Sequence, residues 1–416
     1  MTALTKAPAP TPAKIPAKIP AKIPARIRQK VAGRLGRSDR SAFGMWFWEI
    51  DRVLLLLAFV LMSVGLIAVA AASPAAADRY SGGSVTIAPL HYFWRQLMWV
   101  MLGLPVMIGV SMLPRQAARR LALFGAAFFS VMLVLVPVIG SEVNGAKRWI
   151  GLGFSQFQPS EFLKPFFVVT LAWLLSLRSQ DRSLPVVPLS GLLTAVIALF
   201  LMKQPDFGQT IIFGLMWLSL LMLSGVAMRV MGMLAAAGGA GVVAAYLFYP
   251  VATQRIDNFL FAAGDTYQVD SAHATLTAGG FFGTGPGGGE RKFHLPEAHT
   301  DYIFSVIGEE FGLIACIGVA ALFLAIVVRV FVKLLDEDEP FVVLAAAGLV
   351  TQLAVQAMIN MAVNVNLAPS KGMTLPFVSY GGSSMIALCL GFGLLLAFTR
   401  RNPYLKRSPY VVRWNR

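Results

Sequence analysis

The sequence predicts an all-α polytopic membrane protein with about ten transmembrane helices, and three observations lead to this fold class. The chain has 416 residues, of which 57% are hydrophobic and 13% are charged, whereas soluble domains carry about 25% charged residues. Apolar runs of about 20 residues, the length that crosses a bilayer as a helix, recur along the sequence. The net charge of +15 lies in the two ends of the chain.

The two ends are strongly basic, and the part between them is neutral. Residues 1–40 contain ten Lys or Arg and one acidic residue, and residues 400–416 contain six Lys or Arg and no acidic residue. Basic segments beside apolar spans are typical of the cytoplasmic side, so both termini are predicted to be cytoplasmic. No nucleic-acid partner is expected, because no recognition module accompanies the charge. Cys316 and Cys389 lie inside apolar runs and predict small buried side chains rather than a disulfide.

The N-terminal segment, residues 1–45, is rich in Pro and Ala and contains the repeat PAKIPAKIPAKIPARI at residues 12–27. Proline at every fourth position excludes a stable helix, so this segment is predicted to be a disordered cytoplasmic tail. Residues 46–400 are predicted to form one membrane domain, and residues 401–416 a second basic cytoplasmic tail.

Ten apolar runs make up the predicted membrane domain, and an even number of spans places both ends on one side. The short loops after spans two, four, six and eight carry Arg or Lys, which favours the cytoplasm for them. The extracytoplasmic side then receives the long polar segments, including 141–160 and 364–374, and the largest is 251–301, between spans seven and eight. The predicted spans are Val53–Ala72, Tyr92–Leu113, Leu121–Gly140, Phe162–Leu177, Val186–Met202, Thr210–Gly225, Val230–Pro250, Tyr302–Phe331, Phe341–Val363 and Leu375–Phe398.

The most polar stretch of the chain, ERKFHLPEAHTDYIFSVIGEE at residues 290–310, runs directly into the eighth span. Charged groups at a lipid boundary are costly and usually functional. Asp301 stands where the loop enters the span and is therefore the candidate catalytic residue; the alternative is a helix N-cap. Glu309 and Glu310 follow inside the apolar run, and they are expected to find Arg or Lys partners on another span.

Two further polar segments fall on the same predicted side. Lys147 and Arg148 lie beside Trp149, where they either bind an anion such as phosphate or extend toward the bilayer surface. Asp206, in KQPDFGQT, is more consistent with a helix cap than with a catalyst. The run NVNLAPSKGMTLPFVSYGGSS at residues 364–384 predicts either a cavity that binds substrate or serines that pack helices.

Nucleotide and zinc chemistry receive little support from the same loop. Gly283, Gly285 and Gly288 match G-x-G-x-x-G, but no strand precedes them and no βαβ unit surrounds them. His294, Glu297 and His299 do not have the HExxH spacing of a zinc site.

Four segments together resemble the SEDS family (shape, elongation, division and sporulation). They are GAKRWIGLGFSQFQPSEFLK, KQPDFGQT, LPEAHTDYIFSVIGEEFGL and SKGMTLPFVSYGGSS, and the resemblance covers about residues 46–400. KGMTLPFVSYGGSS is similar to the cell-division branch, whereas the elongation branch usually has G-I-P-L-P in place of GMTLP at 372–376. Ser370 stands where the division branch often has Thr.

This resemblance implies a peptidoglycan glycosyltransferase that polymerises lipid II, a polyprenyl-pyrophosphate-linked disaccharide peptide, at the division septum. It implies a place in the bacterial cytoplasmic (inner) membrane with an extracytoplasmic active site. It also implies a class B penicillin-binding protein transpeptidase and other divisome proteins as partners. The essential aspartate of the family falls on Asp301. The substrate-binding positions that the resemblance implies are Lys147, Arg148, Glu297, His299, Lys371 and Ser379.

A chemical hypothesis follows for these positions. Asp301 would act as general base toward the acceptor hydroxyl. Lys147, Arg148 or a divalent cation (Mg or Mn) would neutralise the leaving pyrophosphate, and no other cofactor is expected. The alternatives are a lipid II flippase, an elongation-type polymerase, and a structural scaffold in which Asp301 is dispensable.

Overall fold

The computed structural model describes residues 42–82, 86–143, 146–152, 155–181, 183–261, 266–370 and 372–400. The predicted tails 1–45 and 401–416 lie outside these residues except for the first turn of α2 (Ala42–Glu49). The chain divides into two compact units, residues 1–48 and 49–416. The second unit carries all the elements described below.

Long apolar helices dominate the second unit and confirm the all-α polytopic prediction. In the described part of the chain, nine helices of at least 18 residues are apolar enough to span a bilayer. A tenth, α8, has 17 residues, close to the lower limit of about 17 for spanning. The ten are α3 (Arg52–Tyr80), α4 (His91–Ser111), α5 (Arg115–Ile139), α6 (Pro159–Ser176), α7 (Val186–Lys203), α8 (Phe207–Leu223), α9 (Met228–Phe248), α12 (Ile303–Leu334), α13 (Pro340–Asn364) and α14 (Gly382–Thr399).

Helices α6, α13 and α14 form the buried centre of this unit, since most of their residues are buried. α6 lies against α5, α8 and α13, and α14 lies against α4. Close packing depends on Gly348 of α13, where an added Cβ would lie 2.7 Å from Val168 and 2.8 Å from Leu220. No residue of the described helix α9 is buried, so its surface is left for lipid or another protein.

The segment 141–160 corrects the prediction of a purely helical chain. It contains three short antiparallel strands in the order β1 (Ser141–Val143), β2 (Ala146–Leu152) and β3 (Ser155–Phe157). A loop at the end of a helix bundle must pair its own backbone groups, and a small sheet does this locally. The sheet directs alternate side chains of β2 to opposite faces.

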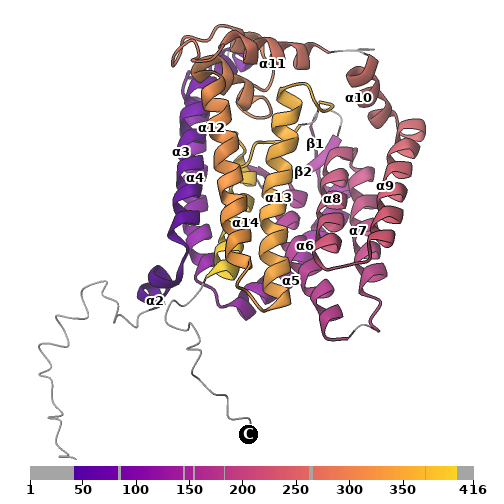
Figure 1. Ribbon diagram of the computed structural model, residues 1–416. Helices are drawn as coiled ribbons and strands as arrows, with labels where there is room; N and C mark the ends of the chain where they lie inside the picture. Colours follow the sequence, from indigo (N-terminus) through magenta and orange to yellow (C-terminus); the bar gives the residue numbers. More distant parts are fainter. Residues whose placement is uncertain are drawn as a thin grey trace, which may run out of the picture. The chain divides into compact units, whose positions relative to one another are not determined.

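The predicted loop 251–301 is also partly ordered into helices. It contains α10 (Pro250–Phe261), α11 (Tyr267–Ala278) and the 3₁₀ turn η2 (Arg291–His294). α11 lies against α12, at the same end of the bundle as β1 and β2 (Figure 1).

Two predicted spans are interrupted. The last span begins at Gly382 rather than Leu375, and Phe377 has a positive φ of 64°. The hydroxyl of Ser379 accepts a hydrogen bond from the backbone N–H of Leu375 at 2.7 Å, which closes a turn that a helix would not contain. Helix α12 is continuous in outline but breaks at Gly312, where φ is 77° and ψ is 179°.

Candidate active site

A cavity of about 810 Å³ lies where α6, α8 and α14 begin. Its walls come from segments far apart in the sequence: α4, β2 and β3, the turn between α7 and α8, residues 297–301 and residues 372–384. Many of its lining side chains are polar or charged, including Arg95, Arg148, Asp206 and Asp301. A polar cavity at the end of an apolar bundle is a candidate binding site.

Asp301 lines this cavity and is not a helix cap. α12 begins at Ile303 with Tyr302 as its N-cap residue, and that cap makes no side-chain hydrogen bond. None of the described residues donates a hydrogen bond to the Asp301 carboxyl group, although its main-chain carbonyl accepts two. The carboxyl lies against Gly372, where an added Cβ would be 3.2 Å from Oδ2. A carboxylate at a cavity wall to which none of the described residues donates is available to a substrate.

The surroundings of Asp301 make it a stronger base than an ordinary carboxylate. Its pKa is raised to about 7: burial is the largest cause, the negative charge of Glu297 adds to it, and Arg255 acts in the opposite direction. A base with a pKa near the operating pH is both deprotonated often enough and basic enough to accept a proton. These properties suit a general base.

Glu297 also lines the cavity, and two neighbours fix its carboxylate. The hydroxyl of Tyr80 donates to Oε1 at 2.6 Å, and that of Thr300 donates to Oε2 at 2.7 Å. Glu297 has a positive φ of 52°, so the chain turns sharply just before Asp301.

His299 does not line the cavity; it packs behind it. Its ring lies 4.3 Å from that of Tyr92, 5.3 Å from Tyr380 and 6.2 Å from Tyr80, between centroids. Burial lowers the pKa of His299 to about 4, so the ring is neutral near pH 7. Its Nδ1 atom has no hydrogen-bond partner within the described residues, and its carbonyl accepts the N–H of Tyr380 at 2.9 Å.

Lys147 and Arg148, the predicted basic pair, lie next to each other on β2, and only one of them lines the cavity. Arg148 lines the cavity, and its guanidinium donates to the carbonyls of Gln204, at 2.9 Å, and Pro205. Lys147, its neighbour on β2, is exposed and is not among the residues that line the cavity. Arg95 of α4 does line it. This residue was not predicted, because a single Arg near the start of an apolar span is typical of a side chain that extends to the interface.

Two predicted positions near the C-terminal end have different outcomes. Lys371 lies outside the described residues. Ser379 is buried and is not a lining residue of the cavity. Its hydroxyl closes the turn at Leu375, and its carbonyl accepts Gln96 Nε2 at 3.1 Å. Its substrate-binding role therefore stays a prediction.

A buried polar network extends from the cavity into the bundle. Lys164 Nζ lies 2.8 Å from Glu161 Oε1 and donates to Gln356 at 3.1 Å, while Gln209 donates to the same Glu161 oxygen at 2.6 Å. Asp206 accepts the N–H of Gln209 at 3.1 Å as the N-cap of α8, which confirms the predicted helix cap. Because each charge has partners, the network can persist inside an apolar bundle.

The buried acids of α12 have partners other than those predicted. Glu309 accepts the backbone N–H groups of Arg291, at 2.6 Å, and Lys292, at 3.0 Å. Glu310 forms an ion pair with Lys292 Nζ and accepts the N–H of Gly287 at 3.1 Å. The donors come from the glycine-rich loop and η2 rather than from another span, because the loop folds back onto α12 near its break.

A metal ion would find few ligands here. Within the ranges that the structure describes, no three His, Cys, Asp or Glu side chains are grouped to hold a metal. Mg²⁺ can nevertheless bind through one or two carboxylates together with substrate phosphates, and Glu297 is a carboxylate that lines this cavity.

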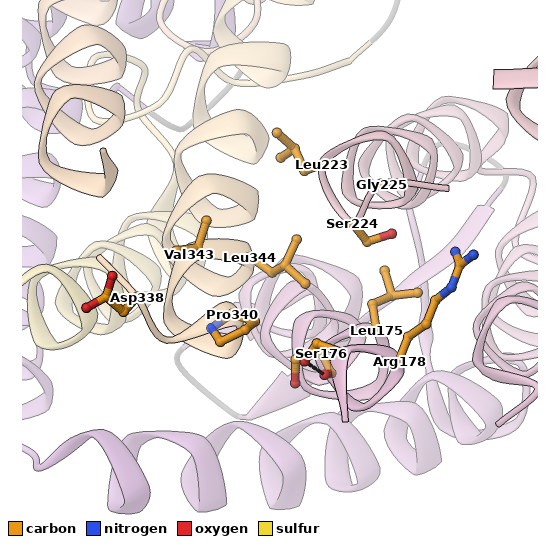
Figure 2. A pocket seen from close by; sticks show the side chains of 11 residues that line it. Leu175, Ser176, Arg178, Leu223, Ser224, Gly225, Asp338, Pro340, Val343 and Leu344 are labelled. Carbon is orange, nitrogen blue, oxygen red and sulfur yellow. Dashed lines mark hydrogen bonds between the residues drawn. The ribbon is translucent and has the colours of Figure 1, made fainter. Parts of the chain in front are cut away.

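A second cavity, of about 590 Å³, lies at the other end of α6 (Figure 2). Its walls are the ends of α6 and α8 and the start of α13, with Leu175, Ser224 and Leu344 among the lining residues.

Fold and site together define a polytopic membrane protein with an acidic cavity at one end of its helix bundle. The sequence matches the family described as "Cell cycle protein", which groups FtsW, RodA and SpoVE, over residues 51–404. The chain therefore belongs to this family, the SEDS family.

Named relatives and solved structures agree with this assignment. A probable peptidoglycan glycosyltransferase FtsW from Caulobacter vibrioides is 37% identical and covers 88% of this chain and 93% of its own length. One from Coxiella burnetii is 34% identical, and the match covers 84% of this chain and 96% of the relative. A chain from a structure described as "Structural coordination of polymerization and crosslinking by a peptidoglycan synthase complex" has a TM-score of 0.68 at 26% identity. The match covers 84% of this chain and 97% of that chain. The rod shape determining protein RodA of Thermus thermophilus has a TM-score of 0.62 at 27% identity, and the match covers 84% of this chain and 96% of RodA.

Proposed function

We propose that this protein is a peptidoglycan glycosyltransferase of the cell-division type, which polymerises lipid II with Asp301 as general base. The observation that carries this proposal is a carboxylate without hydrogen-bond donors among the described residues, with a raised pKa, at the wall of a large polar cavity. The names of the relatives support the reaction class and favour the division type over the elongation type.

In the proposed reaction, the acceptor sugar hydroxyl attacks the anomeric carbon of a second lipid-linked saccharide. Asp301 accepts the hydroxyl proton as the new glycosidic bond forms. The bond from the anomeric carbon to the pyrophosphate oxygen breaks, and its electron pair leaves with the pyrophosphate. Arg95 and Arg148 stand in the same cavity and would stabilise the charge that develops on the leaving group. A divalent cation (Mg or Mn) held by Glu297 and the substrate phosphates would supply further positive charge.

The membrane orientation follows from charge. Arg115 and Arg119 at the start of α5, and Arg329 near the end of α12, belong to the end of the bundle opposite the cavity. The positive-inside bias favours the cytoplasm for that end, which supports an extracytoplasmic cavity. The lipid tails of the substrate then remain in the bilayer while its saccharide enters the cavity.

The proposed partners are a class B penicillin-binding protein transpeptidase and other divisome proteins, at the division site. Support comes from the likeness to a chain of a peptidoglycan synthase complex that coordinates polymerization and crosslinking. A polymerase that supplies glycan strands to a transpeptidase needs such a partner nearby.

The test is lipid II polymerisation by the full-length chain with its transpeptidase in proteoliposomes. Asp301→Asn should lower the rate by at least about 10²-fold, the lower range for loss of a general base. Asp257→Asn is the matched control, because Asp257 lies on α10, accepts a hydrogen bond from Tyr246 and is outside the cavity lining. Normal polymerisation by Asp301→Asn would contradict the proposal.

A further inference from the structure

Two buried asparagines lie one turn apart on α13, directly behind the candidate base. Asn360 and Asn364 are 2% and 0% exposed, and positions i and i+4 share one face of a helix. A primary amide inside an apolar bundle is costly unless its donors and acceptors are satisfied. Their partners therefore indicate what the two amides are for.

The amides satisfy main-chain carbonyls that secondary structure leaves free. Asn360 Nδ2 donates to the carbonyl of Asp301 at 2.8 Å and to that of Met373 at 2.6 Å. Asn364 Nδ2 donates to the same Asp301 carbonyl at 3.1 Å. Asp301 precedes the first residue of α12, and Met373 lies in the non-helical segment before α14, so neither carbonyl belongs to a helix.

Asn364 also fixes the start of α12. Its Oδ1 accepts the N–H of Ser305 at 3.1 Å and the hydroxyl of Ser305 at 2.8 Å, and its Nδ2 donates to the carbonyl of Asn360 at 2.9 Å. The first turn of α12 is thus joined to α13 on the side where Asp301 enters the cavity.

The Asn360 amide sets the distance between two walls of the cavity. One wall carries Asp301, and the other contains Gly372 and Met373. The Asp301 carboxyl already lies so close to Gly372 that an added Cβ would stand 3.2 Å from Oδ2. A single side chain holding the carbonyls of both walls therefore fixes the carboxyl relative to any substrate bound between them.

We propose that Asn360, supported by Asn364, is a positioning residue that holds Asp301 against the segment around Met373 in the geometry needed for proton transfer. This inference rests on the proposed glycosyltransferase function and adds a residue to it. Asn360 does not line the cavity, so it acts through Asp301 and Met373 rather than on the substrate.

The kinetic test compares Asn360→Leu with Gln352→Leu in the full chain with its transpeptidase partner. Gln352 is a buried amide on α13, two turns before Asn360, and lies away from the main cavity among the residues of α13 and α14. Asn360→Leu should lower kcat by about 10²-fold, the cost of a misplacement of about 1 Å, with little change in KM for lipid II. A kcat equal to that of Gln352→Leu would overturn the proposal.

A second measurement does not depend on polymerisation. A hydrophobic carbodiimide labels protonated carboxyl groups, so labelling of Asp301 against pH, read by peptide mass spectrometry with Asp301→Asn as blank, reports its ionisation. Glu297 and Arg255 are the charged groups that act on this carboxyl. Asn360→Leu should shift the midpoint to lower pH, because a loosened carboxyl gains water, and an unchanged midpoint would contradict positioning.

The two measurements separate the inference from the function on which it rests. If the wild type makes no polymer, the proposed function fails, and the labelling midpoint alone decides whether Asn360 positions Asp301. If Asn360→Leu does not accumulate in the membrane, Asn360→Asp takes its place, since it keeps the side-chain size and, when protonated, one donor. That variant should show a smaller loss of kcat, and an unchanged kcat would again overturn the proposal.

Discussion

Asp301 and Glu297 share one cavity wall, and the charge of one controls the proton affinity of the other. Glu297 raises the pKa of Asp301, which is about 7. Since a general base must be deprotonated to act, the polymerisation rate should rise with pH through this value. Glu297→Gln removes the negative charge, so it should lower the pKa of Asp301 and move the rise of the polymerisation rate to lower pH. Rates measured between about pH 5.5 and 8.5 test this, and a rise that stays in place in the variant would argue against Asp301 as the titrating group.

The same pKa has a consequence for stability. The Asp301 pKa is raised from an ordinary value near 4 to about 7 in the folded protein, so its contribution to stability is full below about pH 4 and is lost as pH rises through 7. Asp301→Asn removes this loss. The melting temperature of the variant minus that of the wild type should therefore grow from pH 5 to pH 8 in detergent. A difference independent of pH would mean that the carboxyl titrates as it does in the unfolded chain.

At the residue scale, the sequence located the candidate site but could not assign every side chain in it. Asp301 and Arg148 were predicted from polar residue types at a lipid boundary, and both line the cavity. Lys147 was indistinguishable from Arg148, because the strand that turns adjacent side chains to opposite faces was not predicted. His299 has the residue type of a ligand, and its enclosure by tyrosines depends on contacts between segments distant in sequence.

The glycine-rich loop and the break in α12 form one structural unit at the element scale. The N–H groups of Thr284 and Gly285 donate to the carbonyls of Glu309 and Glu310 at 2.8 and 3.0 Å. A broken helix in a membrane protein is tolerated where other protein groups satisfy its backbone. No local pattern in the sequence indicates that this loop folds against α12, because the contact joins segments about 25 residues apart.

Gly283 and Gly287 offer a matched pair for testing this unit. Both have positive φ, 82° and 79°, so an alanine is strained by a similar amount at each. An added Cβ at Gly283 would lie 2.2 Å from the carbonyl oxygen of Glu310, whereas at Gly287 it would meet nothing within 4 Å. Gly283→Ala should therefore lower the melting temperature clearly more than Gly287→Ala, whose cost is about 1–2 kcal/mol of backbone strain. Equal melting temperatures would show that the loop does not need its contact with α12.

For the whole molecule, the spans were predictable and their arrangement around the cavity was not. The bilayer demands long apolar helices with internally paired backbones, so hydropathy alone located ten of them. The cavity joins residues from Arg95 to Ser384, and no local pattern specifies which segments meet. The apolar run from Leu375 was predicted to be helical because its hydropathy resembles that of a span. Its turn depends instead on the Ser379 hydroxyl and on the contact of the Ser379 carbonyl with Gln96, which is distant in sequence.

At the scale of the whole molecule, the positions of the two cavities favour polymerisation over transport. They lie at opposite ends of α6, and the helices are tightly packed at Gly348 of α13, where an added Cβ would meet Val168 at 2.7 Å and Leu220 at 2.8 Å. A flippase needs a polar path that opens to both sides for the saccharide. We therefore expect proteoliposomes that polymerise lipid II to leave fluorescent lipid II in the leaflet where it was placed, measured by quenching from outside. Translocation that depends on the protein and persists in Asp301→Asn would favour the transporter instead, because a transport path would not require the base.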